Sequence, residues 1–133
     1  MDKKPFVTLE QLREIERTYP TPFYLYDEKG IRENAARLKQ AFSWNRGYKE
    51  YFAVKATPNP FLLNILKDMG CGTDCSSMTE LMMSRACGFS GSDIMFSSND
   101  TPPEEFAYAE KLGAIINLDD ITHIQCLEET LGH

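Results

Sequence analysis

The stretch from Glu50 to Pro60 reads EYFAVKATPNP, and it determines how the rest of the chain is interpreted. The β-prone residues 51–54 predict a buried strand, and Lys55 follows this strand directly. The next residues, T-P-N-P, predict a turn that ends regular structure. Lys55 is therefore either a surface charge at a strand end, with its ammonium in water, or an amine held inside a site.

Three more short β-prone segments follow along the chain, at 71–75, 94–97 and 114–118. Together with 51–54 they start about 20 residues apart, close to the minimum for a strand–helix–strand unit. Helical patterns lie between them. Because short loops join these units, the repeat predicts a parallel α/β sheet built from four consecutive βα units.

Each of the four intervening or following helices has a recognisable start and stop. The expected N-terminal caps are Asn59 before Pro60, Ser77 in a capping box with Glu80, Thr101 in a box with Glu104, and Asp120. The expected last positions are glycines: Gly70, Gly88, Gly113 and Gly132.

The residues before the first strand show two helical patterns and no linker. Residues 5–18 predict a short amphipathic helix whose inner side carries Leu9, Leu12 and Ile15. A β-prone FYLYD follows at 23–27. A second helix then places its apolar residues on one face: Ile31, Ala35, Leu38 and Phe42.

Two architectures fit four parallel βα units, a doubly wound open sheet and part of a (β/α)8 TIM-type barrel. The even repeat and the lack of a Gly-rich first βα turn favour the barrel. A full barrel needs roughly 250 residues, whereas this chain has 133. Residues 1–133 are therefore expected to form the first half of a larger barrel domain.

Composition excludes several classes of function. Apolar residues make up 42% of the chain, and the net charge is −6. Without a basic stripe, the sequence argues against nucleic acid or an anionic membrane as a partner. No apolar run reaches the roughly 18 residues of a membrane span, and the N-terminus lacks a signal-peptide core, so a soluble cytoplasmic protein is expected.

Four cysteines could suggest a metal site or disulfides. They are Cys71, Cys75, Cys87 and Cys126. Their spacings form no paired C-x2-C hooks, and the chain has only two histidines to complete a ligand set. We expect reduced thiols that act as small hydrophobic residues, and no metal site.

Polar residues collect where the predicted strands end. Parallel strands bring their carboxyl ends to one face of the sheet, and sites form there. The residues at these ends are Lys55, Asp74, Asn99, Asp100, Asp119 and Asp120. Asp120, Thr101 and Glu80 are explained as helix caps, and Asp119 as a solvated loop residue. Asp74 has few local roles, which leaves a site role and a structural role both open.

These residues carry a resemblance to a known family. The block Y-x-A-V-K-A at 51–56, the block D-C-x-S-x-x-E-L at 74–81 and the segment 88–120 closely resemble the N-terminal part of diaminopimelate decarboxylases. Those enzymes belong to the alanine-racemase-like fold group of pyridoxal-phosphate (PLP) enzymes, with ornithine and arginine decarboxylases as relatives. The resemblance runs from about Tyr19 to the C-terminus.

The resemblance implies a fold, a cofactor and a reaction. It implies that Lys55 binds PLP covalently, that Asp74 lies near this lysine and the cofactor, and that a PLP-binding (β/α)8 barrel precedes a β-rich domain in a homodimer. The implied substrate is a small-molecule amino acid, meso-diaminopimelate, which loses CO2 to give L-lysine. The glycine-rich phosphate turn and the glutamate partner of the pyridine nitrogen lie further downstream in the family, so we expect this chain to be inactive alone.

Two other interpretations remain. The chain could be a non-catalytic barrel fragment that binds PLP or associates with another copy. It could also be an unrelated flavodoxin-like domain for a nucleotide or flavin, although no Gly-rich turn follows the first strand. His123 and Cys126 fall on the last helix, where packing or surface roles are expected.

Overall fold

The computed structural model describes residues 4–132. Its helices are α1 (Leu9–Thr18), α2 (Glu28–Ala41), α3 (Pro60–Asp68), α4 (Met78–Ala86), α5 (Pro103–Lys111) and α6 (Thr122–Leu131). Its strands are β1 (Tyr51–Ala53), β2 (Gly72–Cys75), β3 (Ile94–Ser98) and β4 (Ile115–Leu118). Two short 3-10 helices, η1 (Val54–Ala56) and η2 (Gly91–Asp93), complete the order.

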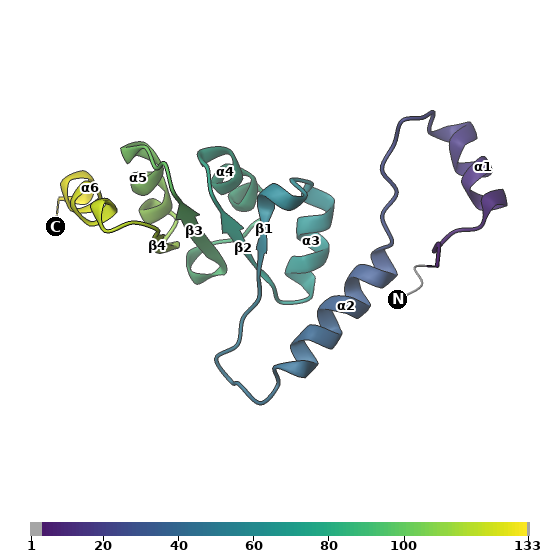
Figure 1. Cartoon of the computed structure of the whole chain (residues 1–133), viewed down its shortest axis with the longest axis horizontal. Coiled ribbons are helices and arrows are strands. Elements are labelled where there is room, and N and C mark those ends of the chain that lie inside the picture. The colour runs from purple at the N-terminus through teal and green to yellow at the C-terminus, as the bar shows by residue number, and fades with distance from the viewer. Residues whose placement is uncertain (1–3, 133) are drawn as a thin grey trace.

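The four strands form one parallel sheet in the order β1-β2-β3-β4, and the helices follow one another alongside it (Figure 1). The register aligns Ala53 with Asp74, Asp74 with Met95, and Met95 with Ile115. This arrangement confirms the predicted α/β class and the predicted series of parallel βα units.

The core lies on one face of the sheet, beneath α3 to α6. Cys75 of β2 and both Ile94 and Phe96 of β3 are fully buried there. They pack in one cluster with Leu63, Leu81 and Phe106 of the helices and with partly buried residues of α6. The rings of Phe96 and Phe106 meet edge to face at 6.1 Å, a favoured aromatic geometry.

Two of the predicted N-terminal caps are confirmed. Asn59 accepts a hydrogen bond from the Phe61 amide at 2.9 Å, and Ser77 accepts one from Glu80. The predicted cap at Asp120 is displaced by one residue, since Ile121 occupies the N-cap position of α6 without a side-chain hydrogen bond. Asp120 Oδ1 still accepts from the Thr122 amide at 2.8 Å and from the Thr122 hydroxyl, and these two bonds lower the pKa of Asp120.

The predicted cap at Thr101 is wrong. Pro102 occupies the N-cap position of α5 without a side-chain hydrogen bond, and Pro103 takes the first helical position. The Thr101 hydroxyl instead donates to the Ser98 carbonyl oxygen at 3.1 Å, so it closes the turn after β3. Two consecutive prolines move the helix start by one residue, because each fixes its own φ and restrains the residue before it.

The first strand is shorter than predicted, and Lys55 does not directly follow it. β1 ends at Ala53, and Val54, Lys55 and Ala56 form the single turn η1. Val54 is fully buried in the core, and its carbonyl oxygen accepts from the Thr57 amide at 3.1 Å. Regular structure therefore continues for one turn before the prolines end it.

The N-terminal segment differs most from expectation. α1 begins at Leu9 rather than residue 5, because Thr8 and Gln11 form a capping box. No residue of α1 is buried, so its predicted inner side is not covered by the described residues. Residues 23–27 form no strand, since no described strand lies beside them.

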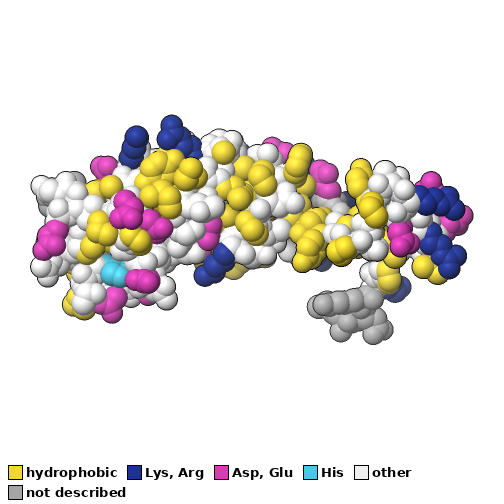
Figure 2. All heavy atoms as spheres, turned by 90° about the horizontal axis from the view of Figure 1, so that it is seen from above, with side chains coloured by type: hydrophobic (Ala, Val, Ile, Leu, Met, Phe, Trp, Pro, Cys, Tyr) yellow, Lys and Arg dark blue, Asp and Glu magenta, His cyan; other side chains and the backbone are white. Residues whose placement is uncertain are grey.

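The second helix carries its apolar face as predicted, with one exception. Ile31, Ala35 and Leu38 of α2 are half-buried and line a cavity of about 380 Å³ shared with β1 and α3. Phe42 is the C-cap residue and is 37% exposed. In Figure 1, α1 and the segment after it extend away from the sheet, and Figure 2 shows hydrophobic side chains at the surface of both parts.

One hydrogen bond connects the N-termini of the neighbouring helices α4 and α5, near the carboxyl ends of the strands. Oε1 of Glu105, in the first turn of α5, accepts from the backbone N–H of Met78, the first residue of α4, at 2.9 Å. The first N–H groups of a helix have no partner within it, and a carboxylate there also interacts favourably with the helix dipole. Glu105 therefore caps a helix to which it does not belong.

Glu105→Ala is expected to lower the free energy of unfolding by about 1 kcal/mol, because the Met78 amide loses its acceptor and α4 loses a negative charge at its N-terminus. Glu104→Ala is the matched control, since Glu104 lies exposed in the same first turn. It should change stability by less than about 0.5 kcal/mol. Urea denaturation followed by circular dichroism measures both, and equal losses would contradict the capping role.

Candidate functional site

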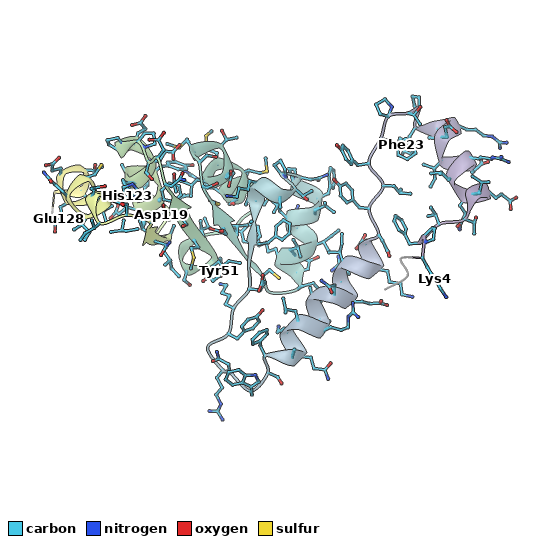
Figure 3. The ribbon with its side chains drawn as sticks, viewed as in Figure 1. Lys4, Phe23, Tyr51, Asp119, His123 and Glu128 are labelled. Atoms are coloured by element: carbon cyan, nitrogen blue, oxygen red, sulfur yellow. The ribbon has the colours of Figure 1, made fainter. Side chains whose placement is uncertain are left out.

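The face of the sheet opposite the core carries a separate set of side chains, which we call the inner face. Because neighbouring residues of a strand point to opposite faces, burial of Cys75 and Phe96 under the helices places the residues between and beside them on the other side. The residues of the inner face are Ala53, Asp74, Met95, Ser97, Ile115 and Asn117. Figure 3 labels Tyr51, the first residue of β1, and Asp119, the residue that follows β4.

Asp74 is the acid of this face. Its Oδ1 atom is buried and has no hydrogen-bond partner among the described residues. Burial raises the pKa of its carboxyl above the ordinary value, the nearby Lys55 ammonium opposes that rise, and the Glu80 carboxylate adds to it. A buried acceptor without a donor is costly, so this oxygen is suited to a group that the described residues do not supply.

Lys55 lies in η1, the turn that follows β1. Its charge is close enough to lower the pKa of the Asp74 carboxyl, which brings together the two residues singled out from the sequence. The side chain is exposed. The desolvation expected for a reactive amine is therefore not provided by residues 4–132.

Glu80 acts mainly as a cap, as expected, but it reaches further back than a capping box requires. Its carboxylate accepts from the Ser76 amide at 2.9 Å and from the hydroxyl groups of Ser76 and Ser77. The Glu80 amide in turn donates to Ser77. With the Met78 amide bonded to Glu105, the N-terminus of α4 is occupied by the chain's own side chains and offers few free amides to an anion.

The other predicted polar residues lie away from this pair. Asn99, Asp100 and Asp119 are exposed, and Asp120 accepts a hydrogen bond from the Thr122 amide. His123 contacts the Phe106 ring edge to face at 5.9 Å, and Cys126 packs against the core. The packing roles expected for His123 and Cys126 are confirmed.

The inner face also contains two polar residues that the sequence reasoning missed. Asn117 Nδ2 of β4 donates to Ser97 Oγ of β3 at 2.9 Å. Both residues lie within strands and not at the strand ends where polar residues were expected to form a site. Alternation with the buried Phe96 and the half-buried Ile116 would have placed both side chains on the face of Asp74.

The cavity between α2, β1 and α3 is separate from this site. Lys55, Asp74 and Ser97 are not among its lining residues, which come from α2, α3, Phe52 of β1 and the loops that join these elements. It includes Tyr48 and Glu50, whose hydrogen bond of 2.8 Å raises the pKa of Tyr48 to about 12.

The cysteines and other ligand types form no second site. All four cysteines carry free thiols, and burial raises the pKa of Cys75 to about 11. Within residues 4–132, no three His, Cys, Asp or Glu side chains group as a metal-ligand set. None of the helices in this range has the length and apolar character to cross a membrane.

The Lys55–Asp74 pair defines what the site can do. A primary amine forms a reversible covalent bond with an aldehyde, and a neighbouring carboxyl orients the amine and holds a proton. Among residues 4–132 the buried Oδ1 of Asp74 has no hydrogen-bond donor, so it provides an acceptor. These residues fit an aldehyde cofactor.

Comparison with protein families gives one match over most of the chain. Residues 28–132 match the model described as pyridoxal-dependent decarboxylase, pyridoxal binding domain. Among curated proteins, the chain is 44% identical over 109 residues to protein TabA of Pseudomonas amygdali pv. tabaci, covering 82% of this chain and 26% of TabA. It is 33% identical to the diaminopimelate decarboxylase of Methanothermobacter thermautotrophicus, covering 87% and 27%.

Solved structures show the same fold. Diaminopimelate decarboxylase from Helicobacter pylori, complexed with L-lysine, superposes with a TM-score of 0.80 at 29% identity, over 91% of this chain and 31% of that one. Lysine decarboxylase from Selenomonas ruminantium gives a TM-score of 0.85 at 19% identity, over 98% and 35%.

These likenesses confirm the barrel architecture over the doubly wound alternative, and they define how much of it is present. The four strands are half of a PLP-binding (β/α)8 barrel, and the chain spans about a quarter of the length of the curated relatives that it matches. With a family model over residues 28–132 and PLP as the family's cofactor, the chain belongs to the pyridoxal-dependent decarboxylases.

Proposed function

We propose that this chain is the N-terminal portion of the PLP-binding barrel domain of a carboxy-lyase that removes CO2 from a diamino acid. The observation that carries the proposal is the placement of Lys55, in the turn after β1, close enough to Asp74 of the inner face to lower the pKa of that acid, whose buried Oδ1 has no hydrogen-bond partner among residues 4–132. An amine and a carboxyl placed together at the carboxyl ends of parallel strands are typical of a site.

Lys55 is the residue that binds PLP covalently, through its amine and the cofactor's aldehyde. Asp74 orients this amine and accepts a hydrogen bond from it. When bound, PLP supplies an electron sink for the negative charge left as CO2 departs. The occupied N-terminus of α4 does not favour the cofactor's phosphate, so we place that group away from this helix end.

The proposed substrate is meso-diaminopimelate, which would give L-lysine and place the protein in lysine biosynthesis. Support comes from several relatives named diaminopimelate decarboxylase at 30–33% identity and from the Helicobacter pylori structure with L-lysine. TabA, at 44%, is the competing guide to the substrate. We further propose a cytoplasmic homodimer.

A second candidate function is cofactor binding without turnover. It is favoured by the exposure of Lys55, since a fully solvated amine is a weaker nucleophile at neutral pH than a desolvated one. Both candidates require a bond between Lys55 and PLP. Only the first requires CO2 release by the protein to which this chain belongs.

Covalent binding is tested by incubating the chain with PLP, reducing it with borohydride and mapping the modified peptide. Trapping should concentrate on Lys55 and fall to background in Lys55→Ala, because Lys55 is the amine whose charge acts on Asp74. Lys111→Ala, an exposed lysine in the last turn of α5, is the matched control and should leave trapping at Lys55 unchanged. Modification spread evenly over all lysines would refute the assignment.

Turnover is tested with diaminopimelate and PLP. The 133 residues alone should release no CO2 above the rate of a Lys55→Ala control, because the phosphate and pyridine contacts implied by the family are not among them. A longer protein containing this segment should release CO2 in a Lys55-dependent manner. Robust release by the 133 residues would contradict the first expectation, and none by the longer protein would favour the non-catalytic candidate.

Asp74→Asn tests the electrostatic position of the acid. Since the pKa of Asp74 is raised on folding, its protonated form favours the folded state below the ordinary value of 3.8, and this contribution is lost as the pH rises through the folded value. The neutral variant should therefore match the wild type at about pH 3.5 and be the more stable at about pH 7. Urea denaturation at both values measures this, and a variant less stable at neutral pH would contradict it.

A further inference from the structure

We propose that Ser97, oriented by Asn117, is a further binding residue of the site and donates its hydroxyl hydrogen to an anionic oxygen of the bound cofactor. The proposal rests on the proposed function, since it presumes that Lys55 takes PLP. It adds residues of β3 and β4 to a site that otherwise consists of Lys55, after β1, and Asp74, in β2.

The position of the two residues follows from the register. Met95 pairs with Asp74, and Ser97 lies two residues further along β3, so both β3 residues share the face of Asp74. Asn117 pairs directly with Ser97. The Ser97–Asn117 pair therefore lies two residues nearer the carboxyl ends of the strands than Asp74 does. These ends are also where η1 carries Lys55.

The hydrogen bond between them leaves one donor unused. Asn117 Nδ2 donates to Ser97 Oγ at 2.9 Å, which makes the serine oxygen the acceptor. A hydroxyl can accept and donate at once, so its hydrogen remains available for another partner. By accepting from Asn117, the serine oxygen also becomes a stronger donor, because linked hydrogen bonds polarise one another.

The surroundings indicate which ligand group would use that donor. Met95 and Ile115, the next residues on the same face, offer no acceptor from their side chains. Ser97 is half-buried and Asn117 exposed, so the pair opens onto the inner face and not into the core. A neutral hydroxyl binds most strongly to a charged oxygen, and PLP carries such oxygens on its ring and on its phosphate.

The experiment measures the affinity for PLP by absorbance titration, together with borohydride trapping at Lys55. Ser97→Ala should weaken binding about tenfold, the loss of one hydrogen bond to a charged group. Asn117→Asp should do the same, because an aspartate accepts the serine hydrogen and withdraws it from the ligand. Ser98→Ala is the matched control on the opposite face of β3, and it should stay within about twofold.

Three further results decide the proposal. Ser97→Thr keeps the hydroxyl and should restore near wild-type affinity, which separates hydrogen bonding from any folding defect. Pyridoxal lacks the phosphate, so repeating the series with it distinguishes the two kinds of oxygen. A loss of affinity confined to PLP assigns the phosphate as the acceptor for Ser97, and an equal loss of affinity for both compounds assigns the ring oxygen. Wild-type affinity in Ser97→Ala, with trapping at Lys55 intact, overturns this inference alone, whereas no trapping in the wild type overturns the proposed function with it.

Discussion

Burial of one face of the sheet is the constraint on which the rest of the structure depends. Cys75, Ile94 and Phe96 are fully buried beneath the helices, and this burial stabilises the chain mainly through the hydrophobic effect. Side chains alternate along a strand, so the same burial forces Asp74 and Ser97 onto the other face. The polar groups of the candidate site are thus positioned by apolar neighbours that never touch a ligand.

The turn above β1 shows the same dependence at the level of single residues. Val54 enters the core completely, while Lys55, the next residue, stays exposed. A single 3-10 turn allows both, because it redirects the chain before Pro58 without extending the strand ladder. An amine at this position is fixed through its backbone even though its side chain is free, which suits a residue that must reach a cofactor.

Much of this organisation could be predicted from the sequence because it depends on local signals. The caps at Asn59 and Ser77 follow from side chains that bond nearby amides, and the strands follow from short apolar runs at a regular spacing. Residues 23–27 looked equally β-prone, but a strand needs a neighbour, and local patterns do not supply one. The hydrogen bond between the Met78 amide and Glu105 joins residues 27 positions apart, so local patterns do not predict it. The hydrogen bond between Asn117 and Ser97 likewise depends on the register of β3 and β4, which the sequence does not specify.

The Glu105–Met78 bond has a consequence for how such repeats evolve and can be engineered. Each βα unit looks self-contained, yet the second unit's helix receives its terminal acceptor from the third. Exchanging either unit between homologues would leave the Met78 amide without its acceptor and the Glu105 carboxylate without its donor. Both groups lie near Asp74, the acid that we assign to the cofactor. These two units should therefore be inherited and transplanted together, as a single module.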